Sequence, residues 1–505
     1  MPPRSSSRSL RRAVAALIAV ALAAQPLGPA ADTIGAARAQ GLPDLGDESQ
    51  TLLSPVQERK LGESIVRQIR AAGAYLDDPE VNDYLNSLGN RLVLAVNDGK
   101  SDFDFFAVND PGINAFALPG GYIGINSGLI LLAQTESELA SVLAHEITHV
   151  TQHHLTRSAA GQQRSMLLSL AALLVAIAAA KAGGSSGGQI AQAAIAGAQA
   201  LSIQTQLNYT RENEYEADRI GFTRLDAAGF EPGSMGSFME RLQRATRFAD
   251  SSAPSYLRTH PITYERIAEA QARAQDRPYR QVVDSLDFHL VRALLRSYAG
   301  TDREAVAFFD DAIAEQKYNN LIAVRYGLVA ALLRAKNYPR AKAELATLEK
   351  VAPPHPMVEA MTGHVLMEAG DLDAAIRRFE AALVRYPNKL QLVYDYPEAL
   401  LKANRPADAI AFLELQMTRF PDNGPLHRTA AQAYAALGKR LQQHRHQGEY
   451  YAWAGDLRGA VVQLELASKA GDGDFYQTSV VETRLRTLRR ELAEQQAAAA
   501  KSGSG

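Results

Sequence analysis

The fold is decided by the stretch Thr135-Glu-Ser-Glu-Leu-Ala-Ser-Val-Leu-Ala-His-Glu-Ile-Thr-His-Val-Thr-Gln-His-His154. It is predicted to form one continuous helix. Two histidines that are four residues apart, His145 and His149, lie one above the other on a helix face, so both imidazoles can reach one metal ion. Glu146 can then face a water on that metal and take its proton. The stretch therefore predicts a helix at the centre of a metal site.

The pattern His145-Glu146-x-x-His149 is typical of zinc peptidases, in which the glutamate acts as the general base. The sequence contains no cysteine, which excludes disulfide bonds, thiolate ligands and a cysteine nucleophile. Any zinc must therefore be held by histidines and carboxylates. We expect one zinc ion (Zn2+) per chain.

A catalytic zinc with two histidine ligands needs a third protein ligand and leaves one position open. Glu214 and Asp218 are four residues apart and share one face of a predicted helix. Glu214 is the expected third ligand, and Asp218 is expected to accept a hydrogen bond from a ligating imidazole and so fix its tautomer. Three alternatives for the third ligand stay open at this point: His153, Glu212 and Glu216.

His260 is the candidate for a further role at the metal. It follows a segment rich in serine, alanine and proline, residues 249–256, which can move. We expect His260 either to stabilise the oxyanion beside the zinc or to occupy the open zinc position in a resting state. The alternative is a histidine that only precedes a helix before Pro261.

The first 39 residues have the pattern of a secretory signal peptide, with a basic start and a short apolar core over residues 13–24. About twelve apolar residues are too few to span a bilayer. Cleavage is expected after Ala39, with Ala23 as the alternative. The mature chain is therefore predicted to lie in a bacterial periplasm. Its net charge of −2 gives no reason to expect a nucleic-acid partner.

Residues 40–280 are predicted to form the metalloprotease domain. Residues 103–108 and 122–126 have strand patterns, and the second of these is expected to be an edge that pairs with an extended substrate. Residues 166–203 are Ala-rich and are predicted to form a helical hairpin. This hairpin is expected to pack against a domain; the alternative is a lid over the site or a peripheral contact with the membrane surface.

Residues 281–492 are predicted to form an α-solenoid of tetratricopeptide repeats. Ala375 and Ala409 occupy the same place in two units 34 residues apart, and so do Pro387 and Pro421. Such repeats stack into a superhelix with a groove for peptide or protein partners. Residues 439–450 depart from the pattern, which predicts irregular last units, and His444 and His446 are expected on the surface. Residues 493–505 are expected to be a disordered tail.

The sequence contains four motifs: the His145–His149 pattern, Glu214-x-x-x-Asp218, the segment Asn114-Ala-Phe-Ala-Leu-Pro-Gly-Gly, and Arg258-Thr-His260-Pro261. Their combination resembles peptidase family 48 of the metallo class. The resemblance implies zinc ligands at His145, His149 and Glu214 and a general base at Glu146. It covers nearly the whole mature chain. A secreted member with tetratricopeptide repeats implies clients among outer-membrane β-barrel precursors and their assembly machinery.

The sequence therefore predicts an α+β, mostly helical protein in which a zincin-type metalloprotease domain precedes an α-solenoid. The predicted function is a periplasmic zinc endopeptidase in envelope quality control, which degrades misfolded outer-membrane β-barrel proteins or assists their assembly. Its expected partners are unfolded or misassembled envelope proteins and, through the repeats, the assembly machinery. The alternative is a chaperone-like repeat adaptor with latent protease activity.

Overall fold

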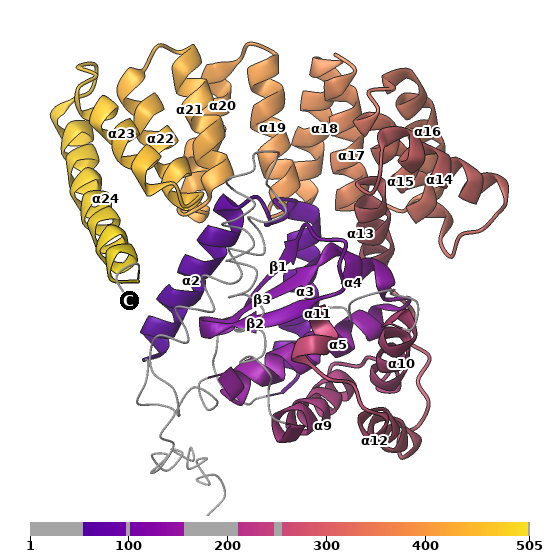
Figure 1. Cartoon of the computed structure of the whole chain (residues 1–505). Coiled ribbons are helices and arrows are strands. Elements are labelled where there is room, and N and C mark those ends of the chain that lie inside the picture. Colours follow the sequence, from indigo (N-terminus) through magenta and orange to yellow (C-terminus); the bar gives the residue numbers. More distant parts are fainter. Residues whose placement is uncertain (1–53, 97–101, 156–210, 247–254, 503–505) are drawn as a thin grey trace, which may run out of the picture. The chain divides into compact units, whose positions relative to one another are not determined.

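A computed structural model describes residues 54–96, 102–155, 211–246 and 255–502 of the chain. The predicted signal peptide and the whole of the predicted Ala-rich hairpin lie outside the described residues, among the first 53 residues and residues 156–210. The described part is mostly helical (Figure 1). It has one small sheet near the helix that contains His145 and His149, which we call the metal helix, and a long series of helices in its C-terminal half. The predicted fold class is confirmed.

The N-terminal part of the described chain contains eight α-helices, three strands and one short 3-10 helix. They are α2 (Pro55–Ala71), α3 (Pro79–Leu94), β1 (Asp104–Val108), β2 (Ala115–Leu118), η2 (Pro119–Gly121), β3 (Tyr122–Asn126), α4 (Ser127–Leu132), α5 (Glu136–Thr151), α9 (Arg211–Ala227), α10 (Ser234–Thr246), α11 (Ser255–Thr259) and α12 (Tyr264–Gln275).

Helix α2 begins at a pair of residues suited to a helix start, Ser54 and Pro55. Ser54 accepts a hydrogen bond from the backbone N–H of Gln57, and the Gln57 side chain accepts one from the backbone N–H of Ser54. Pro55 occupies the first turn, where its missing N–H costs nothing. The turn between β2 and β3 depends on glycine, since Gly120 and Gly121 have φ values of 74° and 85°, a region that glycine adopts without strain.

The sheet has the strand order β1-β3-β2, with β3 parallel to β1 and antiparallel to β2. The prediction that residues 122–126 form an edge strand is therefore wrong, because β3 is the central strand and all five of its residues are buried. The edge strand next to α5 is β2, which contacts that helix. Strand order depends on pairing between distant segments, which a local pattern does not contain.

The C-terminal part consists of helices that follow one another in antiparallel pairs (Figure 1). They are α13 (Leu286–Ser297), α14 (Asp302–Ala314), α15 (Leu321–Arg334), α16 (Tyr338–Val351), α17 (Pro356–Glu368), α18 (Leu372–Arg385), α19 (Leu390–Lys402), α20 (Pro406–Arg419), α21 (Gly424–Ala436), α22 (Arg440–Trp453), α23 (Leu457–Ser468) and α24 (Phe475–Ser502).

The 34-residue period is visible in the turns of this series. Gly370, Asn404 and Gly438 each have a positive φ, and each ends the first helix of a pair. Ala375 and Ala409, the small residues in the repeated position, are both fully buried. The prediction of irregular last units is wrong, because α22 begins 34 residues after α20 and the turn that matches Gly438 in the next unit has its positive φ at Gly471.

The end of the chain differs from the prediction. Residues 493–502 continue helix α24, where the sequence was expected to be disordered from residue 493. The run of alanines from 497 to 500 favours a helix, because alanine has the highest helix propensity. Among the described helices, none combines the length and the apolar character that crossing a membrane requires.

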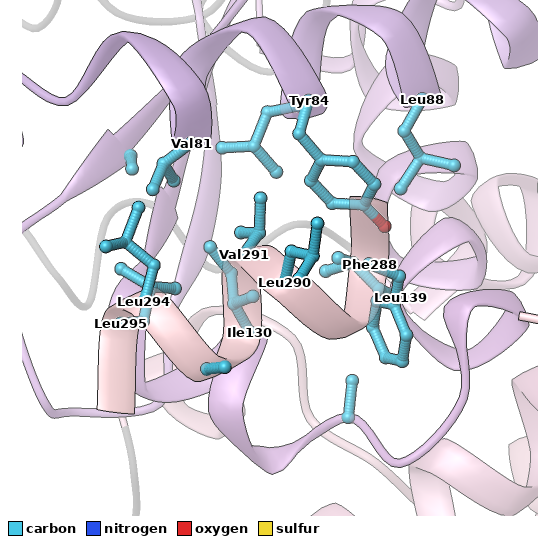
Figure 2. Packing of buried hydrophobic residues seen from close by; sticks show 14 of the residues in the cluster. Val81, Tyr84, Leu88, Ile130, Leu139, Phe288, Leu290, Val291, Leu294 and Leu295 are labelled. Carbon is cyan, nitrogen blue, oxygen red and sulfur yellow. The ribbon is translucent and has the colours of Figure 1, made fainter. Parts of the chain in front are cut away.

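Helix α13 is packed into the same hydrophobic core as the N-terminal elements. Phe288, Val291 and Leu294 of α13 face Tyr84 and Leu88 of α3 across this core (Figure 2). At the start of α5, the Glu136 carboxylate accepts hydrogen bonds from Ser285 Oγ at 2.6 Å and from Tyr84 at 3.0 Å. The metal helix and the first solenoid helix are therefore joined by apolar packing and by a buried carboxylate.

Candidate metal centre

Helix α5 supplies the two histidines of the predicted motif. Thr135 caps the helix by accepting a hydrogen bond from the backbone N–H of Glu138, and every residue from Glu136 to His149 is buried. The Nε2 atoms of His145 and His149 lie 3.0 Å apart. Both imidazoles therefore present the same ring nitrogen to one point.

Helix α9 brings two acidic side chains to these histidines. Glu214 Oε1 lies 3.4 Å from His149 Nε2, and Glu214 Oε2 lies 3.6 Å from His145 Nε2. Asp218 Oδ1 lies 3.0 Å from the opposite nitrogen of His145, Nδ1. The two helices approach closely at Gly221, where a Cβ atom would lie only 3.2 Å from the Ala144 backbone. A residue without a side chain at this position lets α9 reach the motif.

His260, which follows α11, completes the group. Its Nδ1 lies 2.9 Å from Glu214 Oε1 and 3.3 Å from His145 Nε2. Its Nε2 lies 3.6 Å from Glu146 Oε1. Within the described ranges, His145, His149, Glu214 and His260 are the one group of potential metal ligands, with ligand atoms all within 4.8 Å of one another.

The alternatives for the third ligand take other places. His153 is exposed and adopts a φ of 52° just beyond α5. Glu212 is exposed in the first turn of α9, and the Glu216 carboxylate lies 3.0 Å from His154 instead. Neither these two glutamates nor His153 belongs to the group of potential ligands.

The donor set fits zinc. Three imidazoles and one carboxylate, all buried, are ligand types that zinc accepts in a four-coordinate site. Glu146 is fully buried, and in the described part of the chain neither of its oxygens has a hydrogen-bond partner. Its Oε1 faces the His260 imidazole at 3.6 Å, but a buried carboxylate without a hydrogen bond of normal geometry is stabilised by a further polar species beside it, such as a water.

The charges in the site are consistent with metal binding. Burial lowers the pKa of His149 well below its usual range, which keeps the imidazole neutral, the form that binds a metal. Burial alone would raise the pKa of Glu214, but the nearby imidazoles, His260 above all, hold it well below its usual range. Burial raises the pKa of Glu146, and this effect outweighs the attraction of His260 and His145.

Two residues at the site were not predicted from the sequence. Arg266 of α12 binds Asp218 through Nε at 2.6 Å and Nη2 at 2.8 Å, and its Nη1 lies 2.6 Å from Glu214 Oε2. His154 Nδ1 lies 2.8 Å from His149 Nδ1. Arg266 is six residues after His260 at the start of a helix, and His154 is five residues after His149. These spacings become informative only when the tertiary contacts are known.

Comparison with known proteins supports the same reading. Residues 79–274 match peptidase family M48, and residues 366–433 match the tetratricopeptide repeat. The β-barrel assembly-enhancing protease of Escherichia coli (strain K12) is 34% identical over 475 residues, which cover 94% of this chain and 96% of that protein. The Yersinia pestis protein of the same name is 32% identical over 479 residues, which cover 94% and 98%.

A more distant relative aligns with about a third of the chain. The mitochondrial metalloendopeptidase OMA1 of Schizosaccharomyces pombe is 29% identical over 184 residues, which are 36% of this chain and 50% of that protein. The family resemblance predicted from the sequence is therefore confirmed, and so is the enzyme class. This chain is a zinc metalloendopeptidase that belongs to peptidase family M48 and, within it, to the β-barrel assembly-enhancing proteases.

Proposed function

We propose that this protein is a periplasmic zinc endopeptidase that degrades misassembled outer-membrane β-barrel proteins or assists their assembly. The observation that carries the proposal is the buried group of His145, His149 and Glu214 beside a Glu146 carboxylate without hydrogen-bond partners in the described chain. Relatives that align over nearly their whole length are named for β-barrel assembly. The periplasmic location rests on those relatives and on the predicted signal peptide.

In this proposal His145, His149 and Glu214 hold the zinc, and Asp218 fixes the tautomer of His145. Zinc at such a site supplies Lewis acidity and makes water a stronger acid. Glu146 takes the proton from the attacking water and later passes it to the leaving amine. A carboxylate with a raised pKa is suited to this task, because it can hold the proton between the two steps.

His260 is proposed to occupy the open ligand position in the resting state. This alternative is favoured over oxyanion stabilisation because His260 already lies within the ligand group, against Glu214 and His145. Substrate would then have to displace it. His260→Ala is expected to raise the rate of casein cleavage and to change its pH profile. An unchanged rate together with an unchanged pH profile would eliminate any role of His260 at the metal.

The solenoid is proposed to select clients, which include unfolded envelope proteins and components of the β-barrel assembly machinery. The support is the repeat architecture, which presents successive helix pairs to protein partners. The position of His260 also favours a second candidate function, in which the repeats act as a chaperone-like adaptor while proteolysis stays latent.

One experiment separates the two candidates. Cells that lack the protein are complemented with the wild type, with Glu146→Gln or with a chain that lacks the repeats, and the permeability of the envelope is measured. If proteolysis is the main function, Glu146→Gln fails to restore the barrier. Full restoration by Glu146→Gln, together with failure of the chain without repeats, would favour the adaptor.

A further inference from the structure

The two motif histidines are supported differently on their outer side. His145 directs Nδ1 at a carboxylate, Asp218, at 3.0 Å. His149 directs Nδ1 at another imidazole, because His154 Nδ1 lies 2.8 Å away. The far nitrogen of His154, Nε2, lies 3.0 Å from Glu216 Oε2. On its Nδ1 side, His149 is therefore linked to the Glu216 carboxylate by way of His154.

The local backbone brings His154 to this place. Helix α5 ends at Thr151, and His153 takes a φ of 52°, which turns the chain back toward the helix. His154 is fully buried there, and its ring centre lies 4.9 Å from that of His149 with an angle of 74° between the planes. An edge-on contact of this kind directs the ring nitrogens at each other rather than stacking the rings.

The protons in this chain of contacts can be assigned. His149 Nε2 lies among the potential ligand atoms, 3.0 Å from His145 Nε2, so it must keep its lone pair to bind a metal. The proton of neutral His149 is then on Nδ1 and is donated to His154 Nδ1. The proton of His154 is in turn on its Nε2 and is donated to the Glu216 carboxylate.

We propose that His154 and Glu216 are positioning residues that hold His149 in its metal-binding tautomer and ring orientation. The inference rests on the proposed zinc site. The histidine–glutamate pair does for His149 what Asp218 does for His145, and α9 supplies the carboxylate in both cases. Partners of this kind typically contribute a factor of about 10 to 100 in metal affinity.

The test is the zinc affinity of the full-length protein, measured by competition with a chelator. His154→Phe removes both nitrogens, and we expect the affinity to fall by roughly 10- to 100-fold. His154→Asn keeps an acceptor near the Nδ1 position and is expected to recover most of that loss. Glu216→Gln, at a side chain that is 35% exposed, should lower the affinity by less than His154→Phe does. The matched control is His153→Asn, at the exposed neighbour, where asparagine tolerates a positive φ.

A second measurement keeps the proposal falsifiable if His154→Phe does not fold. Imidazole nitrogen NMR of the wild type and of Glu216→Gln reports the tautomer of His149 directly, and we expect the Nδ1–H form in the wild type. An Nε2–H form in the metal-free wild type, or a folded His154→Phe whose zinc affinity is within twofold of the wild type, would overturn the proposal. Loss of zinc in His145→Ala alongside either result would show that the zinc site stands and only this support fails. Retention of zinc in His145→Ala would instead overturn the proposed function.

Discussion

The ion pair between Arg266 and Asp218 links the metal site to helix α12. Both side chains are buried, and two charge-assisted hydrogen bonds of 2.6 and 2.8 Å join them. Burial opposes the charge on Asp218, but hydrogen bonds from His145 and Arg266 hold its pKa below the usual range. The carboxylate thus stays charged between the Arg266 guanidinium and the His145 imidazole, where it can fix the orientation of both.

Asp218→Asn keeps the shape of the side chain and removes its charge. Because Arg266 would remain buried without its main counter-ion, we expect the free energy of unfolding to fall by about 3 kcal/mol. Zinc affinity is expected to fall with it, since a neutral amide oxygen is a weaker acceptor for His145 Nδ1–H than the carboxylate is. Chemical denaturation and chelator competition measure the two effects.

The control for this prediction is Glu269→Gln. Glu269 pairs with Arg219 between the same two helices, α9 and α12, but this pair lies at the surface. Surface pairs contribute little to stability, so the unfolding midpoint should barely move. Equal effects of Asp218→Asn and Glu269→Gln would show that the contribution of the Asp218–Arg266 pair to the free energy of unfolding does not depend on its burial.

At the residue scale, the sequence predicts which residues share a face of the same helix. The spacing of His145 and His149, and that of Glu214 and Asp218, follows from helix periodicity alone. Arg266 and His154 are different, because their role depends on which residues of other segments they meet. His446 was expected at the surface for the same reason, yet it is buried against Tyr434 and His427.

At the scale of elements, helices α21 and α22 are joined by a pair of buried histidines. His427 Nδ1 lies 2.8 Å from His446 Nδ1, and His427 Nε2 donates to the Pro421 carbonyl at 3.1 Å. His446 must then donate to His427, and both rings are neutral. Burial lowers the pKa of His427, and it lowers that of His446 well below the usual range.

This pair predicts a loss of stability in acid. Histidines with a lowered pKa bind protons more readily in the unfolded chain, so stability falls as the pH drops below about 6.5, the ordinary histidine value. Each such group costs up to about 1.4 kcal/mol for one pH unit below that value. We expect the wild type to lose more stability than His446→Phe between pH 7.5 and 5.5, as measured by chemical denaturation.

His444→Gln is the matched control for the histidine pair. His444 lies on the same helix and bonds Gln463 through Nδ1 at 2.9 Å, outside the pair. The His444→Gln variant should show the same pH dependence of stability as the wild type. The same pH dependence in His446→Phe as in the wild type would show that the α21–α22 contact is not acid-sensitive.

The sheet shows where prediction from elements fails. The strand at residues 122–126 was predicted correctly as a strand, but it is central rather than an edge, since β1 and β2 pair with its two sides. β1 and β2 are separated from each other by only a few residues, and either could have paired elsewhere. The repeats were easier to predict, because each unit packs on its sequence neighbours and the period repeats the same contacts.

At the scale of the whole molecule, the protease core continues into the first solenoid helix. Phe288, Leu290, Val291, Leu294 and Leu295 of α13 are all buried in the core that contains α3 and α5. At roughly 2 kcal/mol for each large apolar side chain, their burial contributes about 10 kcal/mol. That is as large as the net stability of a typical domain.

A chain that ends at residue 280, the boundary predicted from the sequence, therefore should not fold or retain zinc. A chain that ends at Val351 keeps α13 to α16, and we expect it to fold and to retain zinc. Circular dichroism and zinc content of the two truncated proteins measure the outcome. A folded chain ending at residue 280 that binds zinc would show that α13 is dispensable to the protease.

The central claim is that His145, His149 and Glu214 bind one catalytic zinc ion. The most direct test is the zinc content of the purified full-length protein, determined by mass spectrometry after dialysis, for the wild type, His145→Ala and the control His153→Asn. We predict one zinc per chain in the wild type and in the control, and almost none in His145→Ala. A wild type without zinc, or His145→Ala with one zinc per chain, would contradict the account.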